Sequence, residues 1–159
     1  MHLIVDRNEI NKIWKYFVDA AIEATNSLCA KSQRGAVIVA DSKIIGRGYS
    51  KPLLEHLCDP CIREAIKDNS RAEMCSAIHA EQLAILDALE KGYKLPGSRM
   101  YHIKVKLGKM IPSGKPSCTL CSRFIHYYKI EFAIWHQEGI GIYQPRELDE
   151  LSFSYFRKN

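Results

Sequence analysis

The amino-acid sequence predicts an α/β sandwich built around a mixed sheet. An N-terminal segment carries hydrophobic residues every three or four positions, two β-rich runs follow it, and helical and strand patterns then alternate toward the C-terminus. The length of 159 residues fits one globular domain with a core of its own. We therefore expect one domain over residues 1–159.

The N-terminal part is expected to form a helix and a hairpin. Residues 8–27 place their hydrophobic side chains on one helical face, and Asn8 is suited to cap this helix. Residues 36–40 form a β-branched run that predicts a strand, and residues 44–49 predict the strand that returns beside it. The Asp-Ser-Lys sequence between the two runs predicts a turn, so the strands should pair as a hairpin.

The remaining elements alternate after a long irregular segment. Residues 50–77 carry several cysteines and show no clear period, and a loop of this length in a compact domain indicates a function or a metal staple. The expected helices cover residues 80–91, 118–128 and 145–156, the expected strands cover residues 99–105 and 130–135, and residues 106–117 form a loop.

Composition excludes several classes of protein. Hydrophobic residues make up 47% and charged residues 26%, and no apolar run reaches the ~20 residues that a membrane helix needs. The first residues lack a basic region followed by an apolar stretch, so we expect a cytoplasmic protein. The net charge of +5 suits a phosphate-bearing ligand or a nucleic acid, although many soluble proteins carry as much.

Six cysteines give the first functional indication. Disulfides do not persist in a reducing cytosol, so these thiols are expected to be free or to bind metal. Cys58 with Cys61, and Cys118 with Cys121, have the C-x-x-C spacing that lets two thiolates reach one metal ion. A single C-x-x-C is also typical of redox pairs, but two of them favour zinc.

A histidine and a glutamate complete a pattern with the second cysteine pair. His79 and Glu81 stand at the start of one expected helix, and Cys118 and Cys121 at the start of another. If the two starts converge, one imidazole and two thiolates can hold zinc and leave the fourth tetrahedral position to water. Glu81 would lie beside that water and could move its protons.

Each part of this pattern is weak evidence for a catalytic site on its own. A single histidine is usually structural, an H-x-E triplet often occurs by chance, and a C-x-x-C can be a redox pair or half of a structural zinc site. Their joint occurrence in this order favours a catalytic zinc, because H-x-E followed by P-C-x-x-C is the signature of zinc deaminases.

With these motifs, the sequence resembles the cytidine and deoxycytidylate deaminase superfamily over roughly residues 10–140. Gly35–Val39 resembles the first strand of that family, Gly48–Pro52 its GYNGxP or GWNxP segment, and His79–Ile85 its HAExNAI segment. The layout is most similar to the deoxycytidylate deaminase branch, although tRNA adenosine deaminases share the core. The resemblance implies a three-layer α/β/α sandwich with a mixed five-stranded sheet, bound zinc, hydrolytic release of ammonia and a homo-oligomer.

The resemblance also implies roles for single residues. His79, Cys118 and Cys121 would bind the catalytic zinc. Zinc hydroxide would attack the amine-bearing ring carbon, C4 of a cytosine. Glu81 would be the catalytic residue that protonates N3 and then the leaving amine.

Contacts with the substrate are less well defined. The resemblance implies that the backbone N–H of Ala80 holds the base and that Ser50 stands where the family contacts the sugar. Ser50 and Leu83 each replace an asparagine of the family, and Ser117 follows Pro116 where the family has Pro-Cys directly. Because polar groups that match the ligand determine specificity, the substrate could be another pyrimidine or a purine derivative.

The remaining four cysteines are candidates for a second, structural zinc. Some deoxycytidylate deaminases bind such an ion through a cysteine after the first helix and others in the loop before the HAE motif, and Cys29, Cys58 and Cys75 resemble those positions. Cys61 adds a fourth candidate, and His56 could replace one ligand. The alternative is that some of these thiols are buried and free, packing as small hydrophobic side chains.

Other polar side chains have ordinary explanations. Three histidines are expected to pack in the core or lie on the surface rather than bind metal, namely His102, His126 and His136. Four basic side chains could meet a phosphate but are expected to be solvated, namely Arg34, Lys51, Arg63 and Arg71.

Three functions follow from the sequence as alternatives. The first is hydrolytic deamination of a cytosine nucleotide or nucleoside such as dCMP or CMP. The second is deamination of another base or of a polynucleotide such as tRNA or DNA, which would need a basic groove with interleaved aromatic residues that the sequence does not suggest. The third is a zinc-stabilised binding module without catalysis, against which Glu81 argues because a structural site does not need a proton shuttle.

Overall fold

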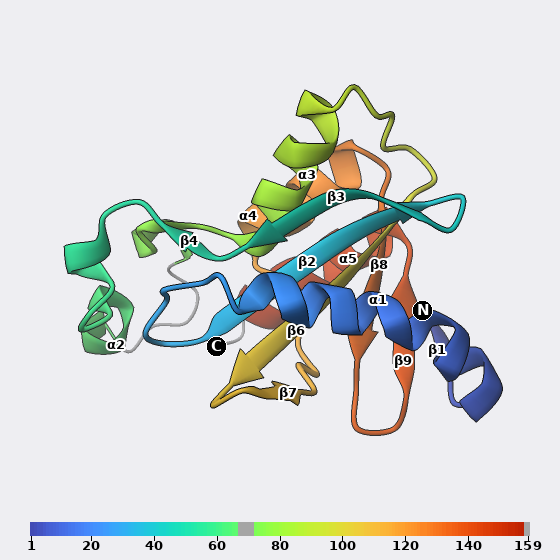
Figure 1. The fold of residues 1–159 in the computed structure, drawn as a ribbon, viewed down its shortest axis with the longest axis horizontal. Coiled ribbons are helices and arrows are strands. Elements are labelled where there is room, and N and C mark those ends of the chain that lie inside the picture. The colour runs from blue at the N-terminus through green and yellow to red at the C-terminus, as the bar shows by residue number, and fades with distance from the viewer. Residues whose placement is uncertain (67–71, 158–159) are drawn as a thin grey trace.

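The computed structural model describes residues 1–66 and 72–157, and its centre is a mixed sheet of seven strands (Figure 1). The order is β1-β9-β8-β6-β2-β3, and β7 pairs with β6. β6 and β8 are parallel, whereas β2 pairs antiparallel with both of its neighbours. The strands are β1 (His2–Ile4), β2 (Gln33–Ala40), β3 (Lys43–Tyr49), β6 (Arg99–Lys106), β7 (Lys109–Ile111), β8 (Glu131–Trp135) and β9 (Ile140–Tyr143).

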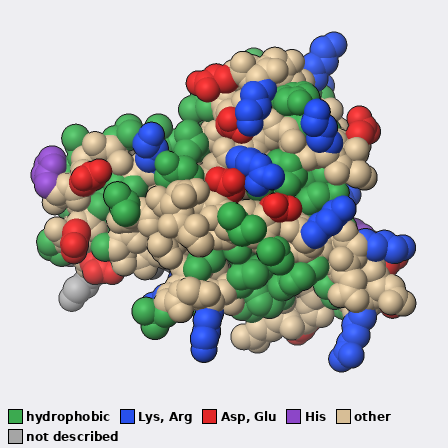
Figure 2. Space-filling view, in the orientation of Figure 1, with side chains coloured by type: hydrophobic (Ala, Val, Ile, Leu, Met, Phe, Trp, Pro, Cys, Tyr) green, Lys and Arg blue, Asp and Glu red, His purple; other side chains and the backbone are tan. Residues whose placement is uncertain are grey.

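Helices cover both faces of this sheet, so the predicted α/β/α class is confirmed. On one face lies α1 (Arg7–Ala24), and on the other lie α3 (Ala80–Glu90), α4 (Thr119–Tyr127) and α5 (Pro145–Arg157). The outer side of α1 is partly hydrophobic, because Val18 and Ile22 are exposed there, and Figure 2 shows hydrophobic side chains gathered over this helix.

The sheet has more strands than the five that the family resemblance implies. β1, β7 and β9 have only three or four residues each, so they show too little alternation for the sequence to reveal them. β7 falls inside residues 106–117, where the sequence predicts a loop. The bounds of the predicted helices and longer strands agree with the structure to within three residues. The predicted cap is wrong, because Asp6 rather than Asn8 caps α1 and accepts the backbone N–H of Asn8 and of Glu9.

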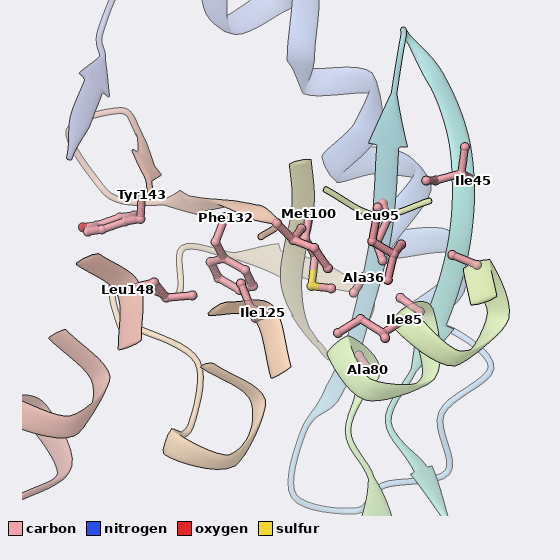
Figure 3. Close-up of a cluster of buried hydrophobic side chains, with 14 of the residues drawn as sticks. Ala36, Ile45, Ala80, Ile85, Leu95, Met100, Ile125, Phe132, Tyr143 and Leu148 are labelled. Atoms are coloured by element: carbon pink, nitrogen blue, oxygen red, sulfur yellow. The ribbon is translucent and has the colours of Figure 1, made fainter. Parts of the chain in front are cut away.

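The sheet separates two hydrophobic cores, one on each face. Between the sheet and α1 lie Phe17, Ala20 and Tyr101, with Val37 from the neighbouring strand. The second core lies under α3, α4 and α5, and Figure 3 shows its side chains converging from the sheet and the three helices. Its largest buried members include Ile38, Met100, Ile125, Phe132 and Leu148.

Two glycines of β3 let α3 lie close against the sheet. A Cβ atom at Gly48 would stand 2.3 Å from the carbonyl oxygen of Ala80, and one at Gly46 would stand 2.3 Å from that of Ala84. Such distances are shorter than any van der Waals contact, so a side chain at either position would push the helix away. Because Ala80 is the first residue of α3, Gly48 sets the place where that helix begins.

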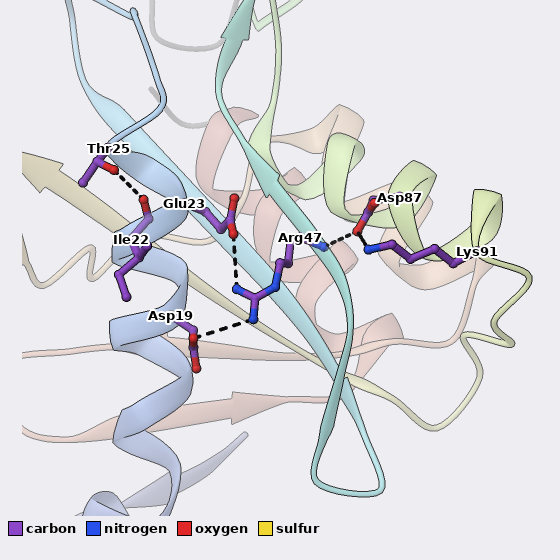
Figure 4. A network of polar contacts seen from close by, with 7 residues as sticks. All are labelled: Asp19, Ile22, Glu23, Thr25, Arg47, Asp87 and Lys91. Atoms are coloured by element: carbon purple, nitrogen blue, oxygen red, sulfur yellow. Dashed lines mark hydrogen bonds and ion pairs between the residues drawn. The ribbon is translucent and has the colours of Figure 1, made fainter.

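Arg47 ties β3 to a helix on each face of the sheet (Figure 4). Its guanidinium lies 3.2 Å from Glu23 and 3.7 Å from Asp19, both on α1. Its backbone N–H donates to a carboxylate oxygen of Asp87 on α3 at 2.8 Å, and Lys91 pairs with the same oxygen at 2.6 Å. These contacts hold β3, the edge strand of the sheet, between α1 and α3.

The cysteine-bearing segment before α3 contains only short elements, and it projects beyond one end of the sheet in Figure 1. The prediction for Arg71 lies outside the described residues. Of the helices that the structure describes, none is both long enough and apolar enough to cross a membrane. The elements are β4 (Lys51–Pro52), η1 (Glu55–Leu57), α2 (Ile62–Ile66), η2 (Ala72–Met74) and β5 (Ala77–Ile78), and β4 pairs with β5.

Candidate metal centre and cavity

Two helix starts meet at one place in the structure. His79 is the residue before α3, and its backbone N–H donates to the side-chain oxygen of Gln82 at 3.0 Å. Cys118 holds the same position before α4, and its carbonyl oxygen accepts the N–H of Ser122 at 2.9 Å. Both starts direct the positive ends of their helices toward the same site, which favours negatively charged side chains there.

The site brings three potential metal ligands together. The Nδ1 atom of His79 lies 3.3 Å from the sulfur of Cys118 and 3.3 Å from that of Cys121, and all three ligand atoms lie within 4.8 Å of one another. With Zn–N of about 2.0 Å and Zn–S of about 2.3 Å, a tetrahedral ion places its nitrogen and sulfur ligands about 3.5 Å apart. The donor types and their spacing therefore fit zinc with one coordination position left over.

The charges of these side chains also suit a cation. Hydrogen bonding to Cys121 and the neighbouring His79 lower the pKa of Cys118 to about 5, although burial opposes this. Burial lowers the pKa of His79, but contacts with Cys118 and Cys75 outweigh it and raise the pKa to about 10. The thiol of Cys118 thus ionises readily, and a metal ion would replace the proton that His79 holds in its absence.

Glu81 lies in the first turn of α3 with its side chain almost fully buried, 4% exposed. It lines a cavity of about 330 Å³ together with His79 and Cys118. Burial raises the pKa of this carboxyl group, but the nearby imidazoles of His102 and His79 and the guanidinium of Arg34 bring it below its ordinary value. Glu81 is therefore ionised near neutral pH and can accept a proton inside the cavity.

The rest of the cavity wall is basic. Four cationic side chains line it, and Glu81 is its one acidic side chain among the described residues. Arg34 and Lys104 are cross-strand partners on β2 and β6. Burial and then the charge of Arg34 lower the pKa of Lys104, as do three further lysines. The four cations in the wall are Lys31, Arg34, Arg63 and Lys115.

The two residues proposed to contact substrate also line the cavity. Ala80 is fully buried at the first position of α3, where a backbone N–H has no partner within the helix. The hydroxyl of Ser50 lies 2.7 Å from that of Ser27 and accepts the backbone N–H of Arg34 at 3.2 Å. Ser50 is thus held beside Arg34, the basic residue of β2 that lines the cavity.

The other four cysteines do not form a second compact cluster. No three of their sulfur atoms lie within 4.8 Å of one another in the described part of the chain. Cys29, Cys61 and Cys75 line the same cavity as His79, whereas the sulfur of Cys58 lies 3.0 Å from the hydroxyl of Ser76. Cys75 contacts the imidazole of His79, and this contact lowers the pKa of its thiol.

His102 is a residue of the site that the sequence did not reveal. It lines the cavity from β6, and its Nε2 atom lies 3.9 Å from a carboxylate oxygen of Glu81. A weak signal was available, because β6 alternates and position 102 shares a face with buried Met100, where an apolar residue is expected. The other two histidines do not line the cavity. His126 is hydrogen-bonded to Asp149, and His136 is hydrogen-bonded to Tyr143.

Aromatic residues of α5 were likewise not identified as part of the site. Tyr155 and Phe156 stand in the last turn of that helix and line the cavity opposite the sheet residues. The hydroxyl of Ser152, also on α5, donates to the backbone carbonyl of Ser117 at 2.7 Å, which fixes the helix against the segment leading to Cys118. The C-terminal helix therefore contributes to a cavity whose motifs lie far earlier in the chain.

Comparison with known proteins identifies a family for this arrangement. Residues 11–137 match the family described as "Cytidine and deoxycytidylate deaminase zinc-binding region", a span that includes His79, Glu81 and both cysteines of the metal centre. No curated protein sequence matches the chain.

Solved structures with the same fold include two of a dCMP deaminase from the cyanophage S-TIM5. The apo form is 20% identical with a TM-score of 0.52, over 80% of this chain and 84% of the other. The form in complex with dCMP and dUMP is 17% identical with a TM-score of 0.50, over 80% and 82%.

A bifunctional protein shares the fold as well. The diaminohydroxyphosphoribosylaminopyrimidine deaminase/5-amino-6-(5-phosphoribosylamino)uracil reductase from Thermotoga maritima is 17% identical with a TM-score of 0.53. The match covers 94% of this chain but only 35% of that longer protein. At these identities the likeness establishes the fold that holds the metal centre.

Proposed function

Because the chain belongs to the cytidine and deoxycytidylate deaminase zinc-binding family, we propose that it hydrolyses the amino group of a cytosine nucleotide or nucleoside, with dCMP or CMP as the preferred class. The convergence of His79, Cys118 and Cys121 beside buried Glu81 carries this proposal. We propose that residues 1–159 form one such domain, since both hydrophobic cores pack on a single sheet.

The reaction replaces the C4 amino group of the cytosine ring by an oxygen from water, so that the base becomes uracil on the same sugar and ammonia leaves. Zinc held by His79, Cys118 and Cys121 would supply hydroxide at neutral pH. Glu81 takes the proton that water loses, delivers it to N3 of the ring, and carries the second proton of that oxygen to the leaving amine. Both protons of the water are thus accounted for, one on N3 and one in ammonia.

The basic wall of the cavity supports a phosphate-bearing substrate. Lys31 and Arg34 lie at or just before the start of β2 and Lys115 lies before α4, and all three line the cavity together with Glu81. A phosphate group makes charge-assisted hydrogen bonds with such side chains, whereas a free nucleoside leaves their charges uncompensated. We therefore expect nucleotides to be bound more tightly than the corresponding nucleosides.

Release of ammonia from a panel of compounds tests the substrate class. The panel consists of cytosine, cytidine, deoxycytidine and their phosphates, with adenine and guanine compounds and a tRNA as alternatives. The proposal expects the highest kcat/KM for a cytosine nucleotide. A higher value for a purine or for the tRNA would instead support the second function considered above.

The Glu81→Gln variant tests whether the site is catalytic. It keeps the size of the side chain but removes the proton acceptor, so we expect ammonia release to fall by about 10²–10⁴-fold while bound zinc is retained. The matched control is Glu90→Gln, the same change at the exposed last residue of α3, which should leave kcat unchanged. No ammonia release from any compound by the unmodified protein would support a binding module instead.

The zinc content of the purified protein tests the second ion. One zinc per chain is expected from the centre at His79, and a second would require Cys29, Cys58, Cys61 and Cys75 to come closer together than they are here. Removal of Cys118 by substitution with serine should lower the count by one. A homo-oligomer, which the family resemblance implies, is tested by sedimentation of the same sample.

A further inference from the structure

His102 is a polar side chain buried beside the carboxylate of Glu81. Only 6% of the residue is exposed, and its Nε2 atom is buried without a hydrogen-bond partner among the described residues. The Oε1 atom of Glu81 lies 3.9 Å from it. An unsatisfied buried donor or acceptor costs about 1–3 kcal/mol, so an apolar residue would stabilise the fold better at this position.

The surroundings of His102 hold its ring in one orientation. The imidazole stacks on Phe132, with ring centroids 5.9 Å apart and planes inclined by 28°. Its cross-strand neighbours are Ala36 on β2 and Ile134 on β8, both fully or almost fully buried. On this face of β6 the ring therefore has apolar cross-strand neighbours on both sides.

Burial lowers the pKa of His102 to about 4, although Glu81 opposes this shift. The imidazole is therefore neutral at pH 7 and has one N–H to donate. A neutral imidazole can donate to a carboxylate oxygen without adding a charge of its own to the buried site.

We propose that His102 is a positioning residue whose Nε2–H donates to the Glu81 carboxylate and fixes the oxygen that faces the substrate. The proposal rests on the proposed deaminase function. A hydrogen bond of this kind has a length of about 2.9 Å, so the two atoms must approach by about 1 Å. Catalytic hydrogen bonds are often long in unliganded sites and shorten when substrate fills the cavity.

The reaction gives this hydrogen bond a purpose. Glu81 has to receive a proton on one oxygen and deliver it first to N3 and then to the amine, which occupy different places in the cavity. A donor on the far oxygen leaves the near oxygen free for these transfers and prevents rotation of the carboxylate. A misplacement of about 1 Å at such a group can cost about 10²-fold in rate.

Two substitutions of His102 separate positioning from packing. His102→Phe keeps an aromatic ring on Phe132 but removes the donor, and we expect kcat to fall by about 10–100-fold while KM and zinc content stay unchanged. His102→Gln places an amide N–H at a similar reach and should restore most of kcat. Equal activity of the Phe variant and the parent protein would overturn the proposal, as would equal losses in both variants.

A measurement without catalysis completes the test. Nitrogen-15 NMR of histidine-labelled protein, in the metal-free and zinc-loaded forms, reports which ring nitrogen of His102 carries the proton, and His102→Phe assigns the signal. We expect a neutral ring with the proton on Nε2 in both forms, and a proton on Nδ1 overturns the proposal. Absence of ammonia release by the parent protein would reject the deaminase function. The NMR result, in contrast, tests only the His102–Glu81 pair.

Discussion

The two faces of strand β6 use the same alternation for different purposes. Toward α1, the strand presents Arg99 at its first residue and then three side chains that belong to an apolar core. Tyr101 packs edge-on against Phe17 with ring centroids 5.3 Å apart, and the ring centroid of Trp14 lies 5.7 Å from that of Phe17. The three core residues of β6 on this face are Tyr101, Ile103 and Val105.

Toward α3, the same strand changes from apolar to charged along its length. Met100 is fully buried in the core, and His102 lines the cavity beside Glu81. Lys104 is the cross-strand partner of Arg34, one of the four basic residues of the cavity wall. The core residues on the α1 face therefore contribute only to stability. On the α3 face, polar side chains replace apolar ones where the strand reaches the cavity. Substitutions on the two faces should accordingly separate stability from activity.

The largest effect on stability is expected on the α1 face. Phe17→Ala removes a side chain with no exposed surface and leaves a cavity between α1 and the sheet, which should lower the free energy of unfolding by about 3–5 kcal/mol. Because no residue of this core lines the cavity, kcat per folded molecule should not change. Urea denaturation and ammonia release measure the two quantities, and a fall in kcat at full folding would show that the faces are coupled.

A smaller loss of stability, combined with loss of activity, is expected at the glycines of β3. Gly46→Ala and Gly48→Ala each place a methyl group 2.3 Å from a carbonyl oxygen of α3, and overpacking of this kind costs about 1–3 kcal/mol. Gly48 faces Ala80, the neighbour of both His79 and Glu81, whereas Gly46 faces the middle of the helix. We therefore expect a larger fall in kcat for Gly48→Ala at similar stability loss.

The measurement compares kcat and the urea midpoint of the two glycine variants. Gly46→Ala is the matched control, since it lies on the same strand and meets the same helix. Equal falls in kcat would mean that α3 shifts as a rigid body. The expected difference between Gly48, which faces the start of α3, and Gly46, which faces its middle, would then be wrong.

The sequence revealed the elements whose patterns are long or chemically specific. Residues 80–91 predict a helix, and the HAE and C-x-x-C motifs each stand at the start of an expected helix. The long strands β2, β3 and β6 follow from β-branched runs. These signals are local, so they can be read without knowledge of the fold.

The remaining features depend on contacts between distant segments. β1 pairs with β9 across nearly the whole chain, and neither strand is long enough to show a period. His102 looks like any polar residue in a strand until α3 places Glu81 beside it. Tyr155 enters the cavity only because α5 returns to Cys118, which no spacing in the sequence indicates.

The link between α5 and the metal centre gives a prediction of intermediate size. Ser152→Ala leaves the buried carbonyl of Ser117 without its donor, which should cost about 1–2 kcal/mol and shift the wall that α5 forms. We expect a higher KM for the nucleotide as well as a lower urea midpoint. Ser154→Ala, an exposed position on the same helix, is the control, and equal effects in both variants would argue against the link.

The smallest effect concerns an ion pair at the end of the sheet that is remote from the metal centre. Arg99 donates to one oxygen of Glu131 at 2.6 and 2.8 Å, and Gln144 donates to the other at 2.8 Å. Burial raises the pKa of Glu131, but the bonds from Gln144 and Arg99 lower it below its ordinary value of 4.5. A carboxylate of this kind stabilises the fold above the pKa of the unfolded chain and loses that contribution as the pH falls through the folded value.

Glu131→Gln should therefore remove part of the decrease in stability between neutral pH and pH values below 4.5. The expected difference is at most about 1 kcal/mol, because the pair is partly exposed and screened by solvent. Urea denaturation across this pH range measures it, with Glu90→Gln on exposed α3 surface as the control that should keep the parent slope. Neither Arg99 nor Glu131 lines the cavity, so kcat at neutral pH should be the same in the parent protein and in both variants. A changed kcat in Glu131→Gln would show that the cavity depends on this end of the sheet as well.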